Sequence, residues 1–265
     1  MTSQLEFPDL LRLIDERSRA FRSAVSTAST LDVTVPTCPE WTLLDLVHHL
    51  GEGRRSWAAT VKAGPGATSR IRPPSDGPAA PREREALVAW LAESTELLLD
   101  ALREAGPERG CWTWWADSQS PRTCGAVARH QLQEVAVHTY DAQLTVGAPQ
   151  PLPDEVALDG VEEFLFTCCA TTSPWPHEPA VVDYDATEGR SWRLWVSADG
   201  ARIARLPEAG GRGAADDGRQ GVGARVSGTS SEIVLAAFYG RRPLEALTIE
   251  GDRGVIDRLI AWEPE

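Results

Sequence analysis

Four long segments in the first half of the chain repeat apolar residues at intervals of three and four. They span residues 8–29, 42–62, 82–105 and 125–146. This spacing places the apolar side chains on one stripe of an α-helix, and each stripe must be buried against another element. Four such helices in succession predict a four-helix bundle, and no other feature of the sequence restricts the fold as strongly.

The pattern changes after the proline-containing stretch at 147–153. A helical segment over 154–171 precedes four shorter runs of β-type residues, PAVVDY, SWRLWVS, ARIARL and GARVSG, and helical patterns return at 230–239 and 252–262. We therefore predict an α+β fold in two domains, a helix bundle over residues 1–148 and a smaller α+β domain over residues 152–265. The glycine-rich segment 207–223 lacks the spacing of a phosphate-binding loop and predicts a hairpin loop.

The charge balance and the cysteines narrow the class of protein. The chain holds 39 acidic and 26 basic residues, a net charge of −13, which disfavours binding to nucleic acid or to anionic membranes. No apolar run approaches the roughly 20 residues that span a bilayer, and the N-terminus does not resemble a signal peptide, so we expect a cytoplasmic protein. Five cysteines without a CxxC pair predict neither a disulfide framework nor a thiolate zinc site.

Two adjacent histidines, His48 and His49, lie in the second helical segment. Thr42, with Asp45 three residues later, predicts a capping box that fixes the start of the helix and therefore its phase. The apolar stripe of this helix would consist of Leu43, Leu46, Leu50 and Trp57. At roughly 100° per residue, His49 lies at the flank of this stripe and His48 points nearly opposite. We expect His49 to face the bundle interior and His48 to face solvent.

Glu134 and His138 are four residues apart, so their side chains lie one turn apart on the same face of the fourth helix. His130 and Asp141 extend that face. With His49, this pair offers two imidazole nitrogens and one carboxylate, which is a donor set for a catalytic zinc with an open position. The pattern alone leaves a second interpretation open, because such pairs also occur on solvated helix faces.

The segment 106–125, which leads into the fourth helix, contains Trp112, Trp114 and Trp115. Three indoles in a loop need an apolar partner. Two interpretations fit: the indoles close the end of the bundle, or they border a substrate pocket beside the metal.

Two motifs, VPTCPEWTLLDLVHHLGE at 35–52 and HQLQEVAVHTYDAQ at 130–143, resemble the mycothiol-dependent maleylpyruvate isomerase family, whose bundle belongs to the DinB-like metalloenzyme fold. The segment 226–262 is similar to that family's C-terminal domain, of the sterol-carrier-protein-like type. The resemblance implies that His49, Glu134 and His138 are the metal ligands. His130 stands where many relatives have arginine, so it is expected as an extra ligand, a substrate contact or a residue without a role in the site. Asp141 is expected either to orient an imidazole or to make a helix-end hydrogen bond.

The resemblance further implies Zn²⁺ or another divalent metal, with mycothiol as the thiol cosubstrate and a small electrophile as substrate, in detoxification or secondary metabolism. The metal-activated thiol, rather than a side chain, would be the nucleophile, and an S-transferase or a cis–trans isomerase would use the same ligands. Two other classes stay open: a metal-dependent enzyme of the same fold that does not use mycothiol, and a non-catalytic protein that binds a small ligand. We expect a monomer or a homodimer.

Overall fold

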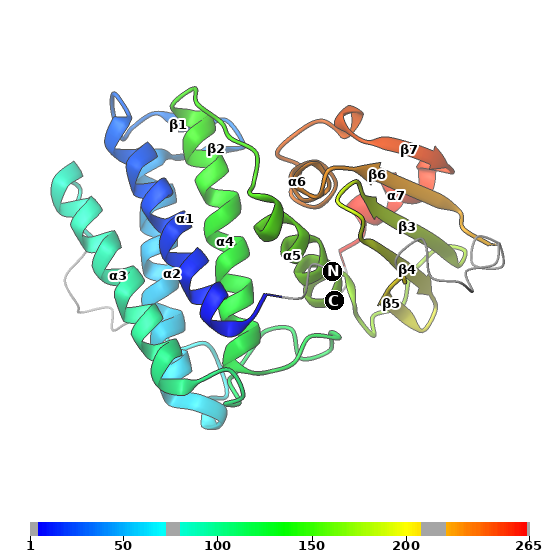
Figure 1. Cartoon of the computed structure of the whole chain (residues 1–265), viewed down its shortest axis with the longest axis horizontal. Helices are drawn as coiled ribbons and strands as arrows, with labels where there is room; N and C mark the ends of the chain where they lie inside the picture. The colour runs from blue at the N-terminus through cyan, green and yellow to red at the C-terminus, as the bar shows by residue number, and fades with distance from the viewer. Residues whose placement is uncertain (1–4, 73–79, 208–220, 264–265) are drawn as a thin grey trace. The chain divides into compact units, whose positions relative to one another are not determined.

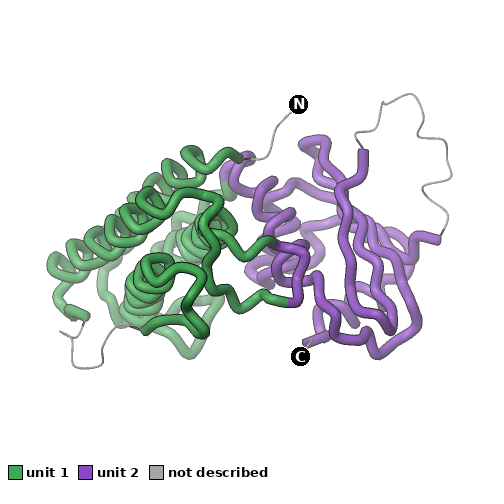
Figure 2. Tube along the Cα trace, turned by 90° about the horizontal axis from the view of Figure 1, so that it is seen from below, with its two compact units in different colours: residues 1–116, 121–152 green, residues 117–120, 153–265 purple. Residues whose placement is uncertain are grey.

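The computed structural model describes residues 5–72, 80–207 and 221–263. The chain divides into two compact units, one of residues 1–116 and 121–152 and the other of residues 117–120 and 153–265 (Figure 2). The first unit is mainly helical and the second combines a sheet with helices, which confirms the predicted α+β fold class. Most of the predicted hairpin loop at 207–223 lies outside the described residues.

The first unit contains the four predicted helices (Figure 1). They are α1 (Phe7–Thr27), α2 (Leu43–Ala63), α3 (Arg84–Ala105) and α4 (Cys124–Thr145). Helix α1 packs against α4, and α2 packs against α3. A short 3₁₀ turn, η1 (Gly64–Gly66), follows α2.

Helix α2 begins at the predicted capping box. The Thr42 hydroxyl accepts a hydrogen bond from the Asp45 backbone N–H at 3.2 Å, and the Asp45 carboxylate accepts one from the Thr42 N–H at 2.9 Å. The four residues of the predicted apolar stripe are all buried. This cap and this stripe fix the rotation of α2 about its axis, and therefore the direction in which its histidines point.

Two contacts tie α2 to its neighbours. A Cβ atom on Gly51 would lie 2.1 Å from the Trp90 ring, so only glycine lets this indole of α3 pack directly on the α2 backbone. The buried guanidinium of Arg54 donates hydrogen bonds to the hydroxyls of Thr95 on α3 and Ser18 on α1, at 2.5 Å and 2.8 Å. Helix α2, which carries both histidines, is therefore fixed by the packing of Trp90 against its backbone and by the hydrogen bonds of Arg54 in the core.

A small hairpin that the sequence patterns did not predict precedes α2. Strands β1 (Thr34–Val35) and β2 (Cys38–Thr42) pair antiparallel, and β1 also contacts α4. Strands this short carry too few residues to show an alternating pattern. Their turn brings Thr37 and Trp41 to the end of the bundle where the histidines lie.

The second unit is built around a five-stranded sheet in the order β5-β4-β3-β6-β7. The strands are β3 (Ala180–Ala186), β4 (Ser191–Ser197), β5 (Gly200–Arg205), β6 (Ala224–Gly228) and β7 (Thr248–Gly251). The pair β3–β6 is parallel and the other neighbours are antiparallel. The sequence patterns did not predict β7, because this edge strand is mostly exposed and lacks apolar alternation.

The helices of the second unit depart from the predicted ones at two places. Helix α5 (Asp154–Phe164) continues as a π-helical turn, η2 (Leu165–Cys169), and α6 (Ser230–Glu232) continues as a second, η4 (Ile233–Phe238). A 3₁₀ turn, η5 (Leu244–Ala246), and helix α7 (Arg253–Ala261) complete the unit. All five cysteines are free thiols. In the described part of the chain, no helix has both the length and the apolar character needed to cross a bilayer.

Candidate metal centre

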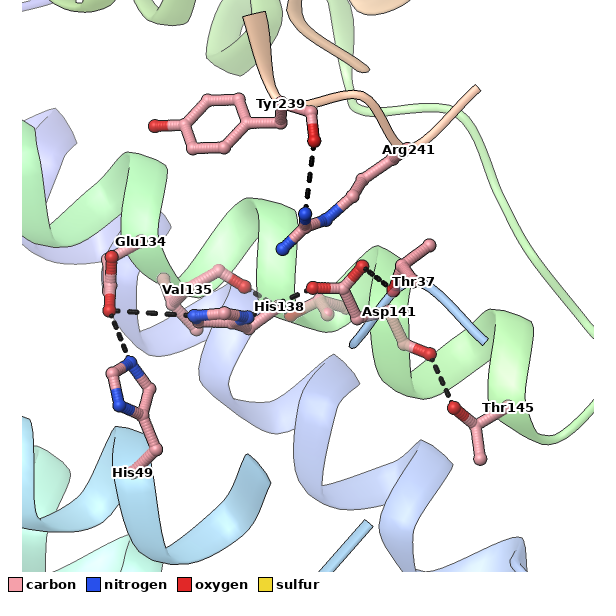
Figure 3. Close-up of polar contacts among 10 residues, drawn as sticks. Thr37, His49, Glu134, Val135, His138, Asp141, Thr145, Tyr239 and Arg241 are labelled. Atoms are coloured by element: carbon pink, nitrogen blue, oxygen red, sulfur yellow. Dashed lines mark hydrogen bonds and ion pairs between the residues drawn. The ribbon is translucent and has the colours of Figure 1, made fainter. Parts of the chain in front are cut away.

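His49 on α2 and the pair Glu134 and His138 on α4 point toward one another (Figure 3). Their ligand atoms all lie within 4.8 Å of one another. One carboxylate oxygen of Glu134, Oε1, lies 2.9 Å from His49 Nε2 and 3.5 Å from His138 Nε2. Within the described ranges, no other group of three histidine, cysteine or acidic side chains converges in this way. Two nitrogens and one oxygen around a common point are a donor set for a divalent metal.

The charges of this cluster depend on one another. Burial alone would raise the pKa of Glu134, but hydrogen bonds with His138 and His49 outweigh it and hold that pKa well below its usual value. Burial would lower the pKa of His138, but hydrogen bonds with Asp141 and Glu134 raise it to about 9. The metal-free cluster therefore pairs an ionised carboxylate with a cationic imidazole, and a cation placed between the ligands would replace the proton of His138.

Asp141 lies one turn beyond His138 on α4 and is fully buried, with an exposed fraction of 0%. One carboxylate oxygen lies 3.0 Å from His138 Nδ1, and the other accepts a 2.6 Å hydrogen bond from the Thr37 hydroxyl. Of the two arrangements expected for Asp141, the structure shows the contact with the imidazole. An Nδ1–H that donates to Asp141 fixes one ring proton on Nδ1, so the proton that a metal would displace is the one on Nε2, the nitrogen that faces Glu134.

Trp41, at the end of the unpredicted hairpin, also belongs to this site. Its ring centroid lies 4.8 Å from that of His49 and 6.5 Å from that of His138. The sequence did contain a signal, because Trp41 immediately precedes the N-cap Thr42 of the helix that carries His49. Helical phase cannot place a residue that precedes the helix.

The expectation for His48 was wrong, and the expectation for His49 holds for its direction but not for its burial. The His49 side chain points to Glu134 and His138 on α4, but it is 41% exposed, because a position at the flank of the stripe lies at the edge of the core. His48 is half-buried instead of solvated: its Nε2 lies 3.1 Å from the Pro81 carbonyl oxygen, and its ring is 6.1 Å from that of Trp90. Pro81, just before α3, and Trp90 on α3 cover His48, on the face of α2 that its helical phase predicted to be exposed.

Trp114 and Trp115 of the 106–125 segment gather with Trp57 around His130, which lies one turn before Glu134, and Trp112 packs on Trp57. The rings of Trp114 and Trp115 lie 5.7 Å and 5.2 Å from His130, and Trp112 lies 6.2 Å from Trp57. Trp115 is only 3% exposed and donates a hydrogen bond to a backbone carbonyl, whereas Trp114 is 49% exposed. The cluster therefore has a buried part that packs on the bundle and one indole that solvent reaches.

The arrangement can be compared with known proteins. Residues 11–143 match the family model described as the mycothiol maleylpyruvate isomerase N-terminal domain, and residues 155–258 match the MDMPI C-terminal domain. Two similar solved structures are a crystal structure of mycothiol-dependent maleylpyruvate isomerase and one of its histidine-to-alanine mutant, with TM-scores of 0.55 and 0.56. Each is 15% identical, and each alignment covers 94% of this chain and 96% of the other. At this identity, these structures show a shared fold. No curated protein matches the chain.

Proposed function

Because the chain belongs to the mycothiol maleylpyruvate isomerase family, we propose that it is a mycothiol-dependent zinc enzyme, either an S-transferase or a cis–trans isomerase. Its substrate would be a small electrophile of detoxification or secondary metabolism. The observation that carries the proposal is the convergence of His49, Glu134 and His138, whose ligand atoms lie within 4.8 Å of one another.

The geometry of these three residues fits a divalent ion. Bonds of ~2.0–2.2 Å place two ligands of one ion at most ~4.4 Å apart, so the observed cluster needs only small side-chain movements to bind it. Three protein ligands leave a fourth position for a cosubstrate, as in catalytic zinc sites. Asp141 supports the fit because it directs the proton of His138 to Nδ1, away from the ligand nitrogen.

The chemistry follows from thiol ionisation. A zinc ion held by these ligands would lower the pKa of a coordinated thiol from ~8.5, so that the thiolate forms at neutral pH. Addition of the thiol to a conjugated cis double bond, followed by bond rotation and loss of the same thiol, would give the trans isomer. Retention of the thiol would give a transferase. The same three side chains serve both outcomes, so the substrate decides between them.

We further propose that the tryptophan cluster forms one wall for the substrate. Trp114 supports this best, since its 49% exposed indole could cover an electrophile, and the neighbouring His130 offers a polar edge one turn from Glu134. Trp112 and Trp115 would support the position of Trp114 by packing on Trp57. The competing role for all three indoles, closing the end of the bundle, is favoured for the buried Trp115.

The matched pair His48 and His49 tests the proposal. We expect His49→Ala to lose bound zinc and mycothiol-dependent turnover, and His48→Ala to keep both, because only His49 contacts Glu134. Metal-dependent turnover without any thiol requirement would favour the second class of enzyme. Wild-type protein that carries no metal and turns nothing over would favour a non-catalytic binding protein.

We also propose that the domain boundary lies at 147–153, with the metal wholly in the bundle. All three proposed ligands and Asp141 belong to the first compact unit, which supports this division. A fragment of residues 1–148 should therefore be soluble, helical and able to bind zinc. A folded fragment without zinc affinity would place part of the site elsewhere.

A further inference from the structure

The second compact unit contains a cavity of about 180 Å³ that shares no residue with the metal centre. The sheet supplies Tyr184 from β3 and Leu194 from β4, both buried. Helix α7 supplies the buried Ile256 and, near its end, Ile260, which is 53% exposed. The cavity thus extends from the face of the sheet to a side chain in contact with solvent.

Both π-helical turns of this unit line the same cavity. Cys168 and Cys169 belong to η2, and Ala237 and Phe238 belong to η4. π-Helical turns are rare, occur mostly as single turns within α-helices and are frequent at functional sites. Two of them, far apart in sequence, converge on one cavity, which indicates a built site and not a packing defect.

The chemistry of the lining selects a neutral ligand. Among the described residues that line the cavity, none carries a charged side chain, and Tyr184 supplies the one side-chain hydroxyl. Burial raises the pKa of Cys169 to about 12 and raises the pKa of Tyr184 as well, so both groups stay neutral at physiological pH. An anion or a cation would lose its hydration here without gaining a charged partner, which disfavours its binding.

The shape of the lining favours a ring. Phe164 and Phe238 stack with their centroids 4.5 Å apart, Tyr184 lies 5.3 Å from Phe238, and Trp262 adds a fourth aromatic side chain. Aromatic pairs are stabilised beyond the burial of their area when the rings meet in stacked or edge-on geometry. An apolar protein cavity of ~150 Å³ accepts benzene, so the volume here fits one ring with a small substituent. From this combination we propose that the cavity binds a neutral, single-ring aromatic molecule.

Toluene is a suitable probe, used with the full-length chain labelled at its leucine and isoleucine methyl groups. We expect toluene to shift the NMR methyl signals of Leu194, Ile256 and Ile260 in a saturable manner at millimolar concentration. Benzoate, a ring of similar size with a negative charge, should leave them unchanged. Absence of saturable shifts, shifts confined to the helix bundle, or equal binding of benzoate would each overturn the proposal.

Two variants that replace an alanine by leucine, one inside the cavity and one outside it, test the assignment. Ala237→Leu fills the cavity from η4 and should weaken toluene binding at least tenfold, whereas Ala261→Leu, at an exposed position of α7 outside the lining, should leave it unchanged. If the Ala237 variant does not fold, Cys168→Met fills the cavity from η2 and should have the same effect. Unchanged toluene affinity in a folded cavity-filling variant would refute the assignment. None of these variants should change the zinc content of the protein. A negative result for the cavity would therefore leave the proposed metal centre unaffected, and the reverse also holds.

Discussion

Replacing Asp141 by asparagine tests whether the proposed metal site depends on the residue behind His138. Asp141 is fully buried, with one oxygen 3.0 Å from His138 Nδ1 and the other accepting a 2.6 Å hydrogen bond from the Thr37 hydroxyl. If Nε2 bound a zinc ion, the imidazole would carry its proton on Nδ1 and donate a hydrogen bond to the carboxylate. Asparagine has nearly the same shape, but it places an NH₂ group against one of these two partners.

Both orientations of the amide weaken the site. If its oxygen keeps the hydrogen bond from Thr37, the NH₂ group faces His138 Nδ1 and favours the tautomer with the proton on Nε2, which cannot bind a metal. If the amide is reversed, the geometry survives but the negative charge that makes the imidazole a better ligand is lost. We expect zinc affinity to fall about 10–100-fold, equivalent to ~1.4–2.7 kcal/mol, the usual effect of losing such an outer partner.

Chelator competition at neutral pH would measure this loss, with circular dichroism to confirm that the variant is folded. Thr37→Val is the matched control: it removes one hydrogen bond from Asp141 but keeps the carboxylate, so we expect a loss of only a few fold. A folded Asp141→Asn protein with wild-type zinc affinity would refute the reasoning, as would an equal loss in both variants.

Five further substitutions test other parts of the structure. Gly51→Ala should lower the free energy of unfolding despite better helix propensity, because its Cβ would lie 2.1 Å from an indole ring. Gly53→Ala, whose Cβ would lie 3.5 Å from the flexible guanidinium group of Arg70, should be neutral or stabilising by up to ~1 kcal/mol in urea unfolding. Trp114→Ala should reduce thiol-dependent turnover while the melting temperature stays unchanged. Trp115→Ala should reduce turnover and melting temperature together, because the loss of its buried packing should lower the free energy of unfolding by ~3–5 kcal/mol. Hydrogen bonds with the N-cap residue Thr42 lower the pKa of Asp45 from its usual value. The stabilisation by this carboxylate is therefore present above that usual value and is lost as the pH falls through the folded pKa, so Asp45→Ala should cost ~1 kcal/mol at neutral pH and less in strong acid.

The parts of the fold predicted from sequence are those with a long, regular apolar repeat. The four helices of the bundle were found because each spans about six turns, and the α2 stripe was placed correctly because a capping box fixed its phase. The strands β3 to β6 were found because they combine β-branched or aromatic residues with turn signals. These elements are stabilised by the same burial that produces their sequence pattern.

The features that escaped prediction depend on contacts between distant segments. The exposure of His49 and the covering of His48 are decided by other elements, with Glu134 on α4 meeting the first and Trp90 on α3 covering the second. Thr37 reaches Asp141 across a sequence separation of 104 residues, and no local pattern encodes that contact. The π-helical turns η2 and η4 share the apolar periodicity of ordinary helices, so their extra width has no signal in the pattern.

The proposed metal ligands and the proposed substrate wall lie on different kinds of structure within the first unit, so the metal site can be assigned to named residues while the substrate stays open. The proposed ligands lie on α2 and α4, whose relative placement is fixed by core packing and by the Gly51–Trp90 contact with α3. The segment 106–123, in contrast, is irregular and places Trp114 in solvent. Rigid helices can keep the same metal geometry while such a loop changes its side chains, which is how one scaffold acquires different substrates. Exchanging Trp114 for other apolar residues should therefore alter the order of preference among electrophiles without changing zinc affinity, whereas substitutions at Asp141 should lower turnover of all of them in the same proportion.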